Sequence, residues 1–167
     1  MKKTRFSTAA TAAFLILGCF MFLALQPALH AQSEASESPD SLQGTWWVTV
    51  TQYDCATGAA RPSFTSLLAF ARGGTMSETT GNPAFQPGQR TSGYGTWSST
   101  EDDTYTSTDE SFIVFSAGPF MQGTQRINHS IRVDGNQLSD KATVQFFDTE
   151  GRLLVSGCAR ATGTRLQ

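Results

Sequence analysis

The sequence predicts an all-β chain that closes into an antiparallel up-and-down barrel of eight strands. Strand-like runs rich in aromatic and β-branched residues recur along the chain, separated by glycine, asparagine, aspartate or proline. No helical periodicity longer than about one turn interrupts them. Cys55 follows the first run and Cys158 lies in the last. A bond between these two cysteines would make the first and last strands neighbours, as a closed barrel requires.

The first strand, expected over residues 44–54, has the clearest pattern in the chain. Trp46, Val48 and Val50 alternate with residues that point the other way, so one face of the strand is apolar. Seven further segments and a ninth candidate follow, and an eight-stranded barrel requires that two of them merge. The expected segments are 64–72, 75–80, 92–99, 103–108, 111–116, 124–133, 141–147 and 152–160.

The merger is expected between 103–108 and 111–116, as one long strand bent at Asp109 and Glu110. These two residues and the acidic group 101–103 are predicted to be solvated turns rather than cation sites. The longest irregular stretch, 81–91, contains two prolines and Phe85. It is either a lid over the barrel mouth or a plain surface connection.

Residues 1–31 have the features of a secretory signal. Three basic residues precede an uncharged run over 7–25, and small residues lead to an exit after Ala31. This pattern favours cleavage over a membrane anchor, with no stable membrane insertion afterwards. We therefore expect an exported protein, periplasmic or secreted, with a flexible Ser-rich and acidic leader over 32–40 and one barrel domain over 41–167.

The charge of the mature chain argues against a nucleic-acid partner. Loss of the three basic residues of the signal leaves nine basic against fourteen acidic residues, a formal net charge of −5. Binding to phosphates needs a clustered positive surface instead. In an oxidising compartment, two cysteines near opposite ends of one small domain favour a Cys55–Cys158 disulfide over two free thiols.

His129 is the only histidine of the mature chain, which leaves no histidine-rich metal cluster. It alternates in phase with Ile127 and Ile131 and is expected to face the interior, as a hydrogen-bonded core residue, a ligand anchor or a general acid or base. If it lines a cavity, His129→Phe should alter ligand binding more than the melting temperature. Glu78 is a second inward candidate, unless its strand faces the other way. An inward carboxylate needs a partner, such as Arg72 or His129, or must stay protonated.

Aromatic side chains supply further candidate ligand contacts. Tyr94 and Trp97 lie on opposite faces of one strand, so only one can line the interior, and Tyr94 is the expected contact. Phe85, Phe112 and Phe146 are the other expected contacts, because a barrel of eight strands can either fill with side chains or hold one small ligand.

The Gly44-Thr45-Trp46 motif resembles the start of the first strand in lipocalins and the wider calycin barrels. The resemblance implies that Trp46 plugs the closed end of the barrel and that an arginine of the last strand lies over it. If the disulfide marks the register, residue 165 falls opposite residue 48, which favours Arg165 over Arg160 for this role. The chain is short and lacks a helix after the last strand, so an avidin-like or other minimal barrel is equally consistent. The chain also resembles small secreted bacterial proteins of unassigned activity.

Two functions follow as hypotheses. In the first, the barrel is a carrier or sensor that holds a small apolar molecule in an uncharged, aromatic-lined interior, and it needs no cofactor. In the second, it is a small enzyme of cyclase or isomerase type, with His129 and Glu78 as the proton-transfer pair. The first is favoured. Whether His129 and Glu78 share one cavity within hydrogen-bonding reach discriminates between them.

Overall fold

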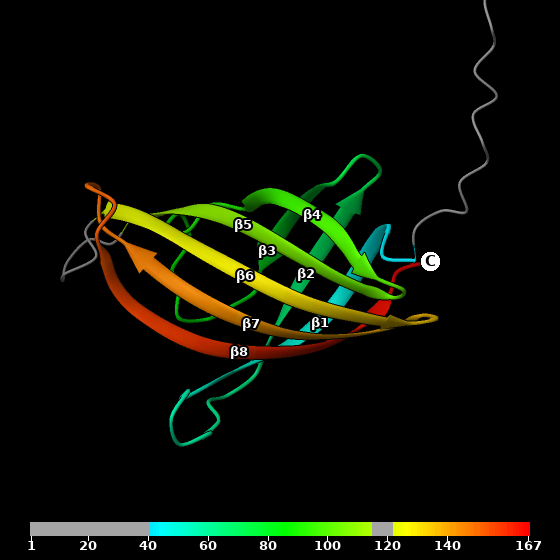
Figure 1. Ribbon diagram of the computed structural model, residues 1–167. Helices are drawn as coiled ribbons and strands as arrows, with labels where there is room; N and C mark the ends of the chain where they lie inside the picture. Colours follow the sequence, from blue (N-terminus) through cyan, green and yellow to red (C-terminus); the bar gives the residue numbers. More distant parts are fainter. Residues whose placement is uncertain (1–40, 115–121) are drawn as a thin grey trace, which may run out of the picture. The chain divides into compact units, whose positions relative to one another are not determined.

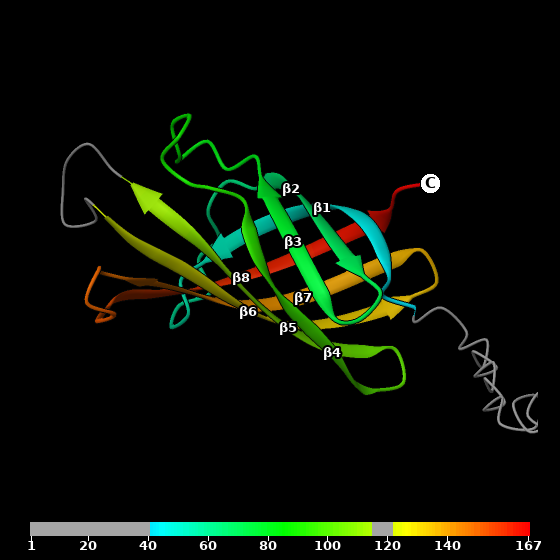
Figure 2. The same cartoon turned by 90° about the horizontal axis from the view of Figure 1, so that it is seen from above.

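The computed structural model describes residues 41–114 and 122–167, and the expected signal and leader lie outside these ranges. The described chain forms a closed barrel of eight antiparallel strands in sequence order (Figures 1 and 2), as predicted. No helix in this part of the chain is long and apolar enough to cross a membrane. The strands are β1 (Gly44–Tyr53), β2 (Phe64–Ala71), β3 (Thr75–Thr80), β4 (Gly93–Glu101), β5 (Thr104–Val114), β6 (Gln122–Asp134), β7 (Gln137–Phe147) and β8 (Leu153–Arg165).

The expected merger of two segments is confirmed, because β5 is one uninterrupted strand that pairs with β6 along its whole length. Most strand limits differ from the expected ones by one or two residues, and the largest differences are in β7 and β8. β7 begins at Gln137 instead of residue 141, while β8 begins at Leu153 and continues to Arg165 instead of ending at residue 160. In β8, small residues alternate with polar ones near the C-terminus, a pattern with less apolar contrast than the other strands have.

The apolar core fills the end of the barrel where β1 starts and β8 finishes. Trp46 is fully buried there and donates a hydrogen bond from Nε1 to the Leu42 carbonyl at 2.9 Å. Phe70, Trp97 and Tyr105 meet edge to face beside it, with ring centroids 6.2 and 5.8 Å apart. This layer closes one end of the barrel, so any cavity must lie toward the other end.

Arg165 covers Trp46 at this closed end. Its guanidinium carbon lies 4.2 Å from the centroid of the indole ring, and its nitrogens donate hydrogen bonds to the carbonyls of Ser41 and Gln43. Gly44 is required beside it: its φ of 123° is rarely adopted by L residues, and a Cβ would lie 2.8 Å from Arg165 Nη1. The two chain ends are therefore fastened together at the barrel base.

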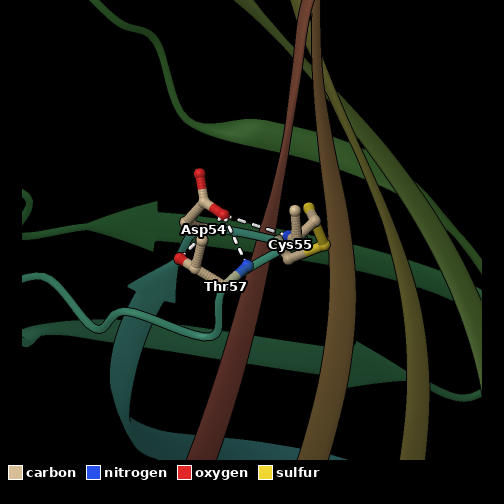
Figure 3. The surroundings of a disulfide bond; sticks show 5 residues. Asp54, Cys55 and Thr57 are labelled. Carbon is tan, nitrogen blue, oxygen red and sulfur yellow. Dashed lines mark hydrogen bonds between the residues drawn. A yellow bond between two sulfur atoms is a disulfide. The ribbon is translucent and has the colours of Figure 1, made fainter.

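The expected contact between Arg165 and Trp46 is present, but the expected register is wrong by two residues. Arg165 pairs directly with Trp46, and Cys158 pairs with Tyr53 rather than with Cys55. The disulfide connects Cys158 to a turn just beyond β1 instead of to a ladder position. In this turn, Asp54 Oδ1 accepts hydrogen bonds from the backbone of Ala56 and Thr57 beside Cys55 (Figure 3).

Arg165→Ala should lower the free energy of unfolding by about 1 to 2 kcal/mol, because it removes a cation–π contact and two hydrogen bonds to the backbone. Arg160→Ala is the matched control: Arg160 is exposed and lies 5.9 Å from the Tyr53 ring centroid. Its loss should cost less than about 0.5 kcal/mol. Denaturant titration of both variants tests the difference, and equal losses would contradict a special role for Arg165.

Candidate functional site

A cavity of about 50 Å³ lies inside the barrel, beyond the closed-end core. One side of its lining comes from β1, β7 and β8 and is formed by Val48, Val50, Ala142, Val144, Ala159 and Ala161. We call these six residues the apolar wall. A buried water needs roughly 10 to 15 Å³ on the same measure, so the cavity has room for about three to five water-sized groups.

The rest of the lining is mixed: it includes further apolar residues and five residues that carry or can carry charge. One of these, Arg160, is exposed and alternates with the buried Ala159 and Ala161, so its side chain points away from the interior. The other four are Glu78, Arg90, His129 and Asp140. Asp109 is hydrogen-bonded to His129 and is itself only 1% exposed. We call these four residues and Asp109 the charged wall. The expectation of an uncharged, aromatic-lined interior is therefore wrong. The interior instead carries both apolar and ionisable groups.

His129 is the centre of the charged wall and faces the interior, as its alternation in β6 predicts. Its Nδ1 lies 2.7 Å from Asp140 Oδ2 and its Nε2 lies 3.0 Å from Asp109 Oδ1. Burial alone would lower the pKa of His129, but the hydrogen bonds to Asp109 and Asp140 outweigh it and raise the pKa to about 10. At neutral pH the ring is therefore an imidazolium that donates to one carboxylate on either side.

Glu78 is also buried and points inward from β3, paired with Arg90 rather than with Arg72 or His129. Arg90 Nη2 lies 2.6 Å from Glu78 Oε2, and Ser66 Oγ donates to Glu78 Oε1 at 3.2 Å. Burial raises the pKa of Glu78, the Asp109 carboxylate adds to this rise, and the Arg90 guanidinium opposes it. The ion pair therefore holds Glu78 in the interior.

Arg90 comes from the segment between β3 and β4, residues 81–92, which contributes three residues to the cavity lining: Asn82, Phe85 and Arg90. The Arg90 side chain is only 3% exposed, and its Nε donates to Gln125 Oε1 at 2.5 Å. Its backbone forms an isolated bridge with Ile113 of β5. This segment therefore does more than connect two strands, because it supplies the cation of the second ion pair and part of the cavity lining.

Gly93 leaves space for two carboxylates of the charged wall. A Cβ on Gly93 would lie 2.2 Å from Asp109 Oδ2 and 3.4 Å from Glu78 Oε2. Any larger residue at this position of β4 would displace Asp109 from His129. The bare Cα thus allows the two groups, Arg90–Glu78 and Asp109–His129–Asp140, to lie next to each other.

Several buried polar atoms of this region have no hydrogen-bond partner within the described residues. They are Asp109 Oδ2, Asp140 Oδ1, Ser107 Oγ and Ser111 Oγ. Leaving such an atom unpaired costs about 1 to 3 kcal/mol, and more for a charged group. Of these four residues Asp140 lines the cavity, so its Oδ1 is the unpaired acceptor that a ligand or an ordered water there would satisfy.

The aromatic candidates divide between inside and outside. Phe85 lines the cavity, with the Arg90 guanidinium 5.9 Å from its ring centroid. Phe146 packs against the cluster of Ala142, Val144 and Ala159 but is not part of the cavity lining. Tyr94 and Phe112 are 70% and 68% exposed. The expectation that they face the interior is wrong, since Trp97 is the inward aromatic of β4 and Phe112 is out of phase with the buried residues of β5.

Three residues of the charged wall were missed from the sequence: Asp109, Asp140 and Arg90. Asp109 was expected in a solvated turn but lies in β5, in phase with the buried Ser107 and Ser111. Asp140 is likewise in phase with the buried Leu138 and Ala142 of β7. Alternation could have found both carboxylates had the strands been extended through them. Arg90 lies outside the strands, where no periodic signal exists.

Within residues 41–114 and 122–167, no cluster of three or more histidine, cysteine, aspartate or glutamate side chains is arranged to hold a metal ion. Comparisons with protein-family models, with curated proteins and with solved structures found no match to this chain.

Proposed function

We propose that this protein is an exported, lipocalin-like binding protein that holds a small molecule inside its barrel, as a carrier or sensor. The observation that carries the proposal is the cavity, which is lined by the apolar wall and by Glu78, Arg90, His129 and Asp140. Small-molecule sites typically combine such apolar lining with a few convergent polar groups. The closed antiparallel barrel and the Gly44-Thr45-Trp46 motif further support it.

Because the lining is both apolar and charged, the proposed ligand differs from the purely apolar molecule expected from the sequence. A wholly apolar molecule would leave Asp140 Oδ1 without a partner, at a cost in free energy that a polar group on the ligand avoids. The proposed ligand is therefore amphipathic, with an apolar part against Val50, Ala142 and Val144 and a polar end toward the charged wall. The volume of about 50 Å³ limits the enclosed part to a narrow group of a few heavy atoms.

Export is supported by the Cys55–Cys158 disulfide, which belongs to an oxidising environment, together with the signal-like residues 1–31. Carriage or sensing in the periplasm or outside the cell is the corresponding role. The enzymatic alternative, with proton transfer between His129 and Glu78, has weaker support. Both residues line the same cavity, but the two ring nitrogens of His129 are occupied by Asp109 and Asp140, and Glu78 is bound by Arg90 and Ser66.

Mass spectrometry under non-denaturing conditions tests the proposal on protein purified from its producing cells. We expect a bound small molecule in the wild type and its loss from Ala159→Phe, because a phenyl ring at this buried position fills the cavity. Ala71→Phe introduces the same ring at an exposed position of β2 and should retain the ligand. If no small molecule accompanies the wild type and none from a fragment collection binds it, the proposal fails.

A further inference from the structure

The charged wall contains more carboxylates than cations. Asp109, Asp140 and Glu78 are carboxylates, whereas His129 and Arg90 are the cations. His129 is shared between two carboxylates and Arg90 is bound to the third. With all five groups ionised, the wall keeps an excess of one negative charge in a region that water barely reaches.

Asp140 is the carboxylate of this group that a ligand in the cavity can reach most directly. Its side chain is 3% exposed, one oxygen is bound to His129 Nδ1, and the other, Oδ1, has no hydrogen-bond partner within the described residues. Asp140 lines the same cavity as Ala142, Ala159 and Ala161. A hydrogen-bond donor placed in the cavity can therefore bind to Oδ1 while its apolar part lies against the apolar wall.

We infer that the ligand of the proposed function is a primary amine in its ammonium form, carrying a short apolar chain. An ammonium group supplies three donors and one positive charge, which satisfies Asp140 Oδ1 and balances the excess carboxylate. A neutral alcohol would satisfy the oxygen but leave the charge. A carboxylate would add a fourth negative group to the three already present, and the Arg90 guanidinium that could receive it is already bound to Glu78 and Gln125.

The cavity volume also limits the chain. Room for about three to five water-sized groups corresponds to an ammonium group with roughly two to four carbons. A longer amine would have to extend past Phe85 and Asn82, which line the cavity from the 81–92 segment. Val144→Ala removes two methyl groups from the apolar wall and so enlarges the cavity without changing a charged residue. The variant should therefore bind longer amines better, relative to shorter ones, than the wild type does.

Isothermal titration calorimetry of the whole exported protein at pH 7 tests this inference, which rests on the proposed function. The probes are n-butylammonium chloride, butan-1-ol and sodium butyrate, which share a chain length and differ in the head group. We expect n-butylammonium to bind at least about tenfold more tightly than butan-1-ol, and butyrate not to bind. Asp140→Asn should weaken n-butylammonium at least about tenfold and change butan-1-ol less than about threefold. Val144→Ala should improve n-hexylammonium relative to n-butylammonium by about threefold or more.

The outcomes separate the two proposals. Equal or tighter binding of butan-1-ol overturns the ammonium assignment and leaves a small-molecule barrel standing. Preferred binding of butyrate also overturns it and would assign the head-group site to Arg90. Binding of none of the three probes, together with an empty wild type in the mass measurement, would remove both proposals. If Asp140→Asn does not fold, the order of the three probes on the wild type and the Val144→Ala shift still decide the assignment.

Discussion

Replacing His129 by phenylalanine should destabilise the barrel by about 3 to 5 kcal/mol at pH 7, the range measured when one partner of a buried ion pair is removed. The substitution leaves Asp109 and Asp140 buried, with side-chain exposures of 0% and 3%, and without the cation between them. The sequence-based expectation that this variant would affect ligand binding more than stability is therefore replaced by the opposite one. Urea denaturation followed by tryptophan fluorescence measures the change.

The same cluster determines how this contribution varies with pH. The pKa of His129 in the folded protein is about 10, above its value of 6.5 in an unfolded chain. A raised pKa means that the folded state binds the proton more tightly, so the stabilisation is fully present below about pH 6.5 and disappears as the pH rises through about 10. The stability gap between wild type and His129→Phe should shrink over that window.

A triple variant is the control for this explanation. His129→Phe combined with Asp109→Asn and Asp140→Asn removes the two buried charges together with the cation. It should recover part of the lost stability, because replacement of a complete buried charge cluster is less costly than removal of one member. A loss below about 1 kcal/mol in the single variant, or an imidazole signal of His129 titrating near pH 6.5 in NMR spectra, would contradict a buried imidazolium.

Removing the disulfide should have an effect of similar size. Cys55 and Cys158 are separated by 103 residues, so the bond restricts nearly the whole unfolded barrel domain. In the chain-entropy model a loop of about 100 residues corresponds to about 4 to 5 kcal/mol of stabilisation. The Cys55→Ser, Cys158→Ser double variant should lose about this amount in urea denaturation.

Reduction provides the matched comparison for the disulfide. Dithiothreitol should lower the wild type to the stability of the double variant and leave the double variant unchanged. The base of the barrel is joined independently by Arg165, Trp46 and the pairing of β1 with β8, so the reduced protein should still fold to the same barrel. Two free thiols in the oxidised wild type, or no response to reduction, would contradict this explanation.

The fold could be predicted because its signals are local and repetitive. The alternation of Trp46, Val48 and Val50 predicted the inward face of β1, and the positions of the two cysteines predicted that the barrel closes. The register could not be predicted from the disulfide, because Cys55 lies in a turn whose geometry depends on Asp54 and Thr57. Direct pairing of Arg165 with Trp46 is set by the ladder as a whole.

The charged wall could be predicted only in part. His129 and Glu78 were expected inside from alternation, but Asp109 was expected in a solvated turn together with Glu110, because acidic residues are mostly exposed. Its burial depends on His129 across β5 and β6 and on the space left by Gly93 of β4. Such compensation between distant residues has no signature in either segment alone. The burial of Arg90 could not be predicted either, since it depends on Glu78 of β3 and the segment that contains Arg90 is irregular.

Methyl NMR of alanine-labelled protein tests most directly whether the barrel interior takes up a small molecule. Ala142, Ala159 and Ala161 line the cavity, whereas Ala60 and Ala71 are exposed elsewhere on the barrel. During titration with n-butylammonium and butan-1-ol, we predict saturable shifts of the three cavity methyl signals, with those of Ala60 and Ala71 unchanged. Unchanged signals from all three cavity alanines throughout both titrations would contradict a ligand-binding interior.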